Sequence, residues 1–121
     1  MEVRMDAKQK QMEDKLADLL KQAAEVASQI QAEEQGPGTP HYDEIEGPAH
    51  EMGQRLSRLI QSSRASDVAA EQDIEIACPD CGRSCRVETK RRDVHCMDGP
   101  LELTESVAYC RRCRRSFFPS A

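Results

Sequence analysis

The chain has 121 residues, of which 32% are charged and 3% aromatic, and it contains no Trp. So little large apolar material excludes a sizeable core, and we expect one small domain with extensions, stabilised by a bound metal ion. The formal net charge of −5 conceals an asymmetry, because residues 1–73 carry 8 basic and 15 acidic side chains whereas residues 74–121 carry 9 and 7.

No apolar run follows the first residues, and no stretch approaches the roughly 20 apolar residues of a membrane span. We therefore expect no signal peptide and no membrane partner. Six cysteines without a secretory signal then indicate a cytoplasmic protein whose thiols bind metal rather than form disulfides.

Residues 2–34 are predicted to form one helix. Apolar side chains recur there in two rows with seven-residue spacing, interrupted at Gln9: Met5, Met12, Leu19 and Val26, and Leu16, Ala23 and Ile30. Such a seam is typical of a coiled coil, which would make the chain a homodimer through residues 2–34. The repeat covers only about four heptads, so an amphipathic helix packed on a domain of the same or another chain explains it equally well.

Residues 35–49 are predicted to be a linker, because Gly36–Pro40 and the pair Gly47–Pro48 interrupt any regular pattern. Residues 50–73 are predicted to form a short second helix, over residues 50–65, followed by a polar, acidic connector. The helix is amphipathic, with one apolar face formed by Met52, Leu56, Leu59 and Ile60.

Residues 74–121 contain two cysteine pairs, Cys78–Cys81 and Cys110–Cys113, separated by 28 residues. Four thiolates in two Cys-x-x-Cys turns, joined by a hairpin, suit one tetrahedral zinc ion. This spacing predicts a four-cysteine zinc ribbon with one structural zinc. Cys85 lies four residues beyond Cys81 and is an alternative ligand, and iron is an alternative metal for a four-thiolate site.

The residues between the pairs are predicted to form a β-hairpin over about 86–109, preceded by a short strand at Ile74 and Ile76. Pro100 lacks the N–H that would close a two-residue turn, so we expect a four-residue loop over residues 97–100. That register sets three pairs opposite one another: Cys96 and Leu101, Val94 and Leu103, and Arg92 and Glu105. Cys96 would then be a small buried apolar side chain.

Basic residues cluster on this ribbon. The candidate DNA contacts are six arginines on the hairpin and around the second cysteine pair: Arg91, Arg92, Arg111, Arg112, Arg114 and Arg115. Clustered arginine on a rigid, metal-held scaffold suits phosphate contact, although the same residues also serve zinc ribbons that bind proteins. Phe117 and Phe118 either stack on bases or, as we favour, pack beneath the second pair.

The sequence offers no catalytic constellation. It has no Gly-rich phosphate loop, no Gly-x-Ser-x-Gly and no His-Glu-x-x-His. A zinc ion with four cysteine ligands has no open position for activating water. Cys85 and Cys96 have no base near them in sequence except His95. We expect the chain not to be an enzyme and to take no small-molecule substrate.

Five segments of the C-terminal half carry a resemblance: Cys78–Gly82, Arg91–Arg92, Gly99, Tyr109–Cys113 and Phe117–Pro119. Together they resemble the zinc-ribbon region of bacterial insertion-sequence transposases of the ISKra family, and residues 54–70 are similar to the segment upstream of it. In that family a catalytic domain of RNase H-like fold follows the ribbon.

The resemblance implies that the chain is the N-terminal, zinc-binding, DNA-contacting region of such a transposase, truncated or split before its catalytic domain. The DNA partner would be the ends of the mobile element. Two alternatives stay open at this point. One is a zinc-ribbon module that binds proteins and dimerises through its helical arm, and the other is a relic without function.

Overall fold

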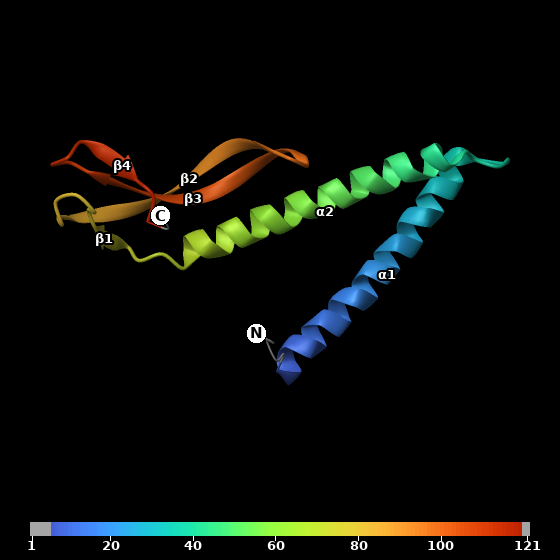
Figure 1. Ribbon diagram of the computed structural model, residues 1–121, viewed down its shortest axis with the longest axis horizontal. Helices are drawn as coiled ribbons and strands as arrows, with labels where there is room; N and C mark the ends of the chain where they lie inside the picture. The colour runs from blue at the N-terminus through green and yellow to red at the C-terminus, as the bar shows by residue number, and fades with distance from the viewer. Residues whose placement is uncertain (1–5, 120–121) are drawn as a thin grey trace, which may run out of the picture. The chain divides into compact units, whose positions relative to one another are not determined.

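The computed structural model describes residues 6–119 (Figure 1). The order of elements is α1 (Ala7–Gln35), α2 (Tyr42–Ala70), β1 (Glu75–Ala77), β2 (Ser84–Cys96), β3 (Gly99–Cys110) and β4 (Arg115–Phe117). The chain is therefore a small α+β protein, as expected. It divides into two compact units, residues 1–51 and residues 52–121, and each is described by itself.

Helix α1 begins at a capping box. The Asp6 side chain accepts a hydrogen bond from the Gln9 backbone N–H, and the Gln9 side chain accepts one from the Asp6 N–H. This exchange satisfies two of the donors that a helix N-terminus leaves free. The helix ends before Gly36, whose φ of 67° suits glycine. The predicted start at residue 2 and the seam residue Met5 lie outside the described residues.

Helix α2 corrects the prediction for the middle of the chain. Residues 42–49, predicted to be linker, are helical, and the helix continues to Ala70, well beyond the predicted end. Only residues 36–41 between the two helices lack regular structure. The Gly47–Pro48 pair that suggested a break lies inside the helix.

A contact with α1 helps α2 to accommodate Pro48. Proline has no N–H, so the carbonyl four residues earlier, that of Glu44, loses its helical donor. The Gln35 side-chain amide donates a hydrogen bond to this Glu44 oxygen at 3.2 Å. The Gln31 amide donates to the next carbonyl, that of Ile45, at 3.4 Å. Such compensation between helices does not appear in a local sequence pattern.

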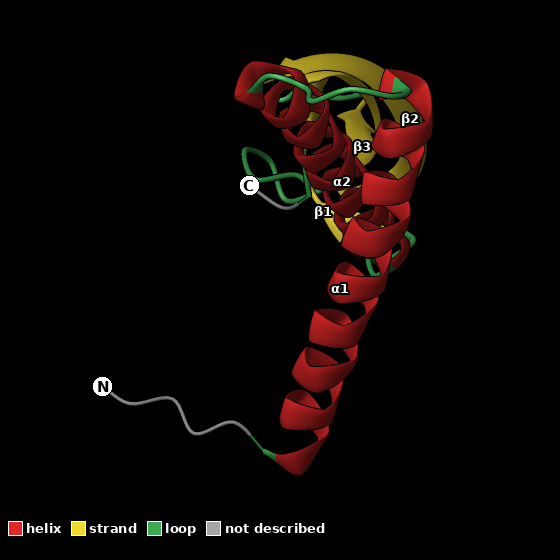
Figure 2. Cartoon of the chain, turned by 90° about the vertical axis from the view of Figure 1, so that its right-hand side faces the viewer, coloured by secondary structure: helices red, strands yellow, loops and turns green. Residues whose placement is uncertain are grey.

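The strands form one antiparallel sheet in the order β1-β2-β3-β4. Figure 2 shows the strands in yellow and the helices in red. Every connection is a turn between neighbours in sequence. The first cysteine pair lies in the turn from β1 to β2, and the second lies in the turn from β3 to β4. Because β2 and β3 form a hairpin, these two turns meet at the same end of the sheet.

The predicted register of this hairpin is wrong by two residues. Cys96 pairs with Gly99, so the loop is the dipeptide Met97–Asp98. Pro100 pairs with His95, next to the closing pair, where a backbone N–H points away from the partner strand and is not needed for the ladder. Gly99 takes a φ of 111°, a value that glycine adopts without strain.

The register error changes which residues face each other. Val94 lies opposite Leu101, Arg92 opposite Leu103 and Lys90 opposite Glu105. Arg92 still reaches Glu105, two residues along the facing strand, with 2.6 Å between Nη2 and Oε1. Diagonal neighbours in a sheet lie within reach of long side chains.

The C-terminal part of α2 contacts the hairpin through its polar face, a contact that the sequence pattern does not predict. Ser57 and Arg58 donate hydrogen bonds to Asp98 in the hairpin loop. Ser106 of β3 donates to the Ala69 carbonyl of α2. The predicted apolar face instead remains 41–59% exposed at its four residues, Met52, Leu56, Leu59 and Ile60.

The core is correspondingly small. Among the described residues the buried apolar side chains are Cys78, Cys85, Ala108 and Cys110. Ile76, Val87 and Phe117 pack against them half-buried. Four small buried residues contribute too little apolar burial to hold a domain alone, which agrees with the expectation of a metal staple.

Candidate metal centre

The two cysteine pairs form turns with the same backbone geometry. In the first knuckle, residues 78–82, the Gly82 N–H donates to the Cys78 carbonyl at 2.9 Å. In the second, residues 110–114, the Arg114 N–H donates to the Cys110 carbonyl at 2.7 Å. Each donor residue has a positive φ, 75° at Gly82 and 55° at Arg114.

The structure brings together the sulfurs of Cys78, Cys81, Cys110 and Cys113, all within 4.8 Å of one another. The Sγ atoms of Cys78 and Cys113 lie 3.8 Å apart, and those of Cys81 and Cys110 lie 3.6 Å apart. A disulfide requires about 2.05 Å, so neither pair is bonded. Tetrahedral zinc with bonds of about 2.3 Å requires neighbouring sulfurs about 3.8 Å apart. The four cysteines therefore have the spacing that a metal ion needs.

Hydrogen bonding favours a charged sulfur in this group despite the opposing effect of burial. Cys78 and Cys110 are buried, and Cys81 and Cys113 are half-buried. The backbone N–H of Cys113 donates to Cys110 Sγ at 3.4 Å, and this bond lowers the pKa of Cys110 to about 6. The hydrogen bond with Cys81, together with burial, raises the pKa of Cys113 to about 12. In the metal-free group one sulfur thus holds a charge and another holds its proton.

An ion pair joins the two knuckles outside the cysteine group. The guanidinium of Arg115, at the start of β4, contacts the carboxylate of Asp80, which lies between the first two cysteines. Both side chains are more than half exposed, so the pair contributes about 0–1 kcal/mol. A contribution of that size helps to orient the two turns but is too small to hold them together.

The two remaining cysteines lie outside the group of four sulfurs. Cys85 is buried, its thiol donates to the Arg83 carbonyl at 3.3 Å, and burial raises its pKa. Cys96 is half-buried near the hairpin loop, where its thiol donates to the Gly99 carbonyl at 3.2 Å. Both thiols therefore act as hydrogen-bond donors to the backbone.

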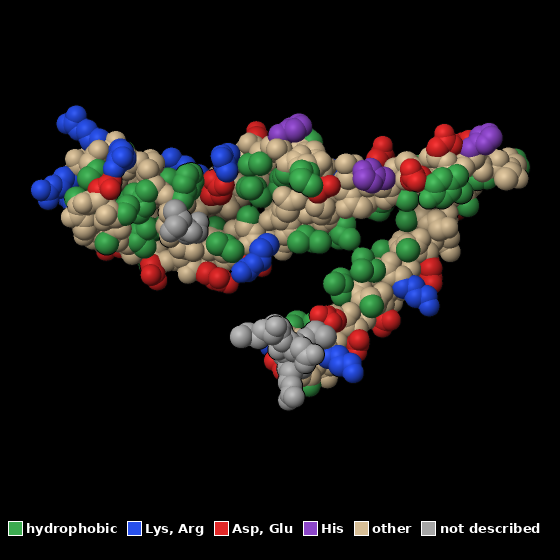
Figure 3. Space-filling model, in the orientation of Figure 1, with side chains coloured by type: hydrophobic (Ala, Val, Ile, Leu, Met, Phe, Trp, Pro, Cys, Tyr) green, Lys and Arg blue, Asp and Glu red, His purple; other side chains and the backbone are tan. Residues whose placement is uncertain are grey.

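The six arginines predicted to contact DNA divide into two groups. Three have carboxylate partners: Arg91 with Glu102 at 3.7 Å, Arg92 with Glu105 at 2.6 Å, and Arg115 with Asp80. Within residues 6–119 the other three, Arg111, Arg112 and Arg114, form no ion pair, and all three are exposed. These three lie in the second knuckle. Figure 3 shows basic side chains at the end of the sheet that carries the knuckles.

Two further basic residues were missed by the sequence analysis. Arg83 follows the first knuckle and Arg86 lies in β2, and both line a groove on the sheet that also contains Lys90 and Arg111. A signal was present in the sequence, because Arg86, Lys90 and Arg92 alternate with other residues and so share one face of β2.

The two phenylalanines near the C-terminal end differ in burial. Phe117 packs against the buried cysteines, in agreement with packing beneath the second knuckle. Phe118 is half-exposed.

Comparison with protein-family models, curated proteins and solved structures found no match. No helix in the described part of the chain has a stretch both long and apolar enough to cross a membrane.

Proposed function

We propose that this protein is a DNA-binding module whose fold is stabilised by zinc. Zinc binds between the two knuckles, and the arginines of the second knuckle contact the phosphate backbone. The resemblance in the cysteine-rich region supports a more specific role, that of the N-terminal region of an insertion-sequence transposase. The DNA would then be the ends of the mobile element.

The choice of zinc rests on the donor set. Four thiolates in a tetrahedral arrangement are typical of structural zinc, and they leave no coordination position for water or substrate. Cys78, Cys81, Cys110 and Cys113 would be the ligands, and the ion would supply folding free energy rather than chemistry. With so small a core, the ribbon depends on that contribution.

The main observation that supports the proposed DNA binding is the position of the unpaired arginines. Arg111 and Arg112 lie between the two ligands of the second knuckle, and Arg114 follows directly. Their backbone would be fixed by the metal, so little backbone freedom would be lost on binding. No described carboxylate neutralises them, and a guanidinium matches two phosphate oxygens at once.

The test is fluorescence anisotropy of a labelled duplex oligonucleotide, with the zinc-loaded full-length protein titrated at several salt concentrations. Each lost phosphate contact should reduce the salt slope by about 0.9. Arg112→Ala combined with Arg114→Gly should therefore reduce it by about 1.8, glycine being chosen because it suits the positive φ of Arg114. The control Arg91→Ala removes an arginine that already pairs with Glu102 and should change the slope less.

Failure to bind the duplex even at low salt would overturn the proposal. An unchanged salt slope in the double variant would show that Arg112 and Arg114 do not contact phosphate.

A second candidate function is a protein-interaction module with a helical dimerisation arm. The supporting observation is the exposed apolar side of α1, where Leu16, Leu19 and Val26 are all at least half exposed, as the hydrophobic side chains in Figure 3 illustrate. Salt-insensitive binding to a protein partner, without any DNA binding, would favour this candidate over the first.

A further inference from the structure

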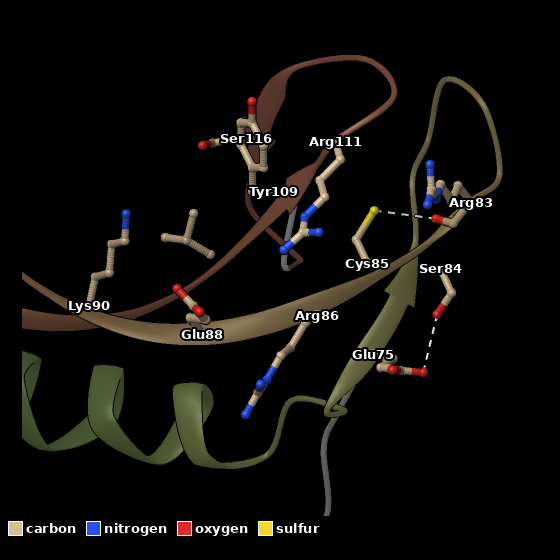
Figure 4. A pocket seen from close by; sticks show the side chains of 11 residues that line it. Glu75, Arg83, Ser84, Cys85, Arg86, Glu88, Lys90, Tyr109, Arg111 and Ser116 are labelled. Carbon is tan, nitrogen blue, oxygen red and sulfur yellow. Dashed lines mark hydrogen bonds between the residues drawn. The ribbon is translucent and has the colours of Figure 1, made fainter.

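A groove of about 620 Å³ runs along the sheet within residues 75–116. Its walls come from all four strands, since Glu75, Lys90, Tyr109 and Ser116 belong to β1, β2, β3 and β4 respectively (Figure 4).

The strand register places most of this groove on the face opposite the core. Glu88 lies opposite Val107, and Tyr109 lies opposite Ser116, so these four line one face. Their neighbours Val87 and Ala108 point to the other face, where the cysteine core lies. Cys85 is the buried core residue that also lines the groove, so Lys90 and Tyr109 can be altered without replacing a core side chain.

The groove has a positive charge excess. Four basic side chains line it, namely Arg83, Arg86, Lys90 and Arg111, against the two carboxylates of Glu75 and Glu88. None of the four basic groups forms an ion pair with a described residue. Glu75 is engaged by the Ser84 hydroxyl, which donates to it at 3.2 Å.

The basic groups are spread along the groove rather than gathered at one point. In Figure 4 the Arg111 side chain extends from the second knuckle toward β2. The Arg86 side chain extends away from Arg111, and Lys90 lies farther along β2. A single small anion would contact only one of these groups. A polymer with repeated negative charges would contact several of them, as the backbone of a nucleic acid does.

Tyr109 adds an aromatic surface to this cationic groove. Its side chain is 51% exposed and lines the groove. An exposed ring beside basic groups is the arrangement on which unpaired bases stack. In a duplex the faces of each base are covered by its neighbours, so the ring can stack only on a base that is unpaired.

We propose that this groove binds a single-stranded segment of nucleic acid, with its phosphates on Arg83, Lys90 and Arg111 and one base stacked on Tyr109. The proposal rests on the nucleic-acid-binding function proposed above and extends it. Arg112 and Arg114 of the second knuckle would hold duplex, and the groove, which includes Arg111, would hold an unpaired strand beside it.

The test compares two labelled probes, an oligothymidylate of about 12 nucleotides and a duplex of the same length, on the zinc-loaded full chain. Tyr109→Ala should weaken single-strand binding at least about fivefold, because stacking on one base contributes about 1–3 kcal/mol, and should leave duplex binding unchanged. Tyr109→Phe keeps the ring and should bind as the wild type does. Lys90→Ala should lower the single-strand salt slope by about 0.7.

Intrinsic fluorescence provides a direct readout of stacking. The chain has no Trp and two Tyr, so Tyr42→Phe leaves Tyr109 as the only tyrosine. Oligothymidylate should quench its emission at the concentrations that produce the anisotropy change.

The outcomes separate the two proposals. Wild-type single-strand affinity in Tyr109→Ala, or unquenched Tyr109 emission in the complex, would overturn the proposed single-strand binding in the groove. The proposed duplex binding would still stand. Absence of binding to both probes would overturn the proposed function and the groove together. Duplex binding weakened by Arg112→Ala/Arg114→Gly but not by Tyr109→Ala, together with single-strand binding weakened by Tyr109→Ala, would support both.

Discussion

Gly82 and Arg114 occupy equivalent positions in the two knuckles, each four residues after the first cysteine and each with a positive φ. In each case the backbone N–H closes the turn onto the carbonyl of that first cysteine. Glycine adopts this conformation freely, whereas a residue with a side chain is strained there. The first knuckle is thus relaxed, and the second keeps an arginine despite the strain.

Arg114→Gly should therefore stabilise the zinc-loaded protein by about 1 kcal/mol, the order of the left-handed penalty. Gly82→Ala should destabilise it by a similar amount, because no described atom within 4 Å would obstruct the new methyl group and only the backbone strain changes. Chemical denaturation of both variants measures the difference. A destabilised Arg114→Gly would show that the arginine side chain contributes more to the fold than its strain costs.

Loss of one ligand should unfold the ribbon. Cys78→Ser and Cys113→Ser each remove a sulfur from the group of four, and we expect loss of stoichiometric zinc together with loss of the strand signal in circular dichroism. Cys96→Ser is the matched control, since its sulfur lies outside the group, near the hairpin loop. Zinc loss in Cys96→Ser equal to that in Cys78→Ser would contradict the ligand assignment.

Zinc affinity should rise with pH. A sulfur must lose its proton to bind the metal, and the pKa of Cys113 is raised to about 12 whereas that of Cys110 is lowered to about 6. At pH 7 Cys113 is protonated and binding releases its proton, so affinity falls as pH falls. Competition with a chromophoric chelator between about pH 6 and 8 should show at least about a tenfold change per pH unit. A flat profile would contradict the protonation states described.

The exposed seam of α1 predicts self-association. Leu19→Lys introduces a charge into a row of side chains that would face a partner helix, and sedimentation should then show a shift from dimer toward monomer. Ser28→Lys adds the same charge away from that seam and should not change the association. A wild-type chain that is monomeric at all concentrations would exclude the coiled coil. A packed amphipathic helix would then explain the repeat.

The spacing of cysteines and turn residues was sufficient to predict which four sulfurs come together, because each knuckle is a local turn and only one hairpin separates them. The hairpin register was not predictable in the same way. A slip of one residue would move every side chain to the other face, but a slip of two preserves the faces. The apolar pattern therefore could not distinguish Leu101 from Leu103 as the partner of Val94.

The errors in the helical region have a different origin. Pro48 marks a break by every local criterion, yet Gln35, thirteen residues earlier, donates to the carbonyl that Pro48 leaves unpaired. The apolar residues of α2 suggested its buried face, but Ser57 and Arg58 contact the hairpin instead. Both outcomes depend on contacts between elements, which periodicity does not encode.

X-ray absorption at the zinc K-edge of the purified, full-length protein would test the central claim most directly. We predict one zinc per chain, surrounded by four sulfur atoms at about 2.3 Å, with fewer sulfurs at the metal in Cys113→Ser. A first shell containing nitrogen or oxygen, or a protein that folds without bound zinc, would contradict the account.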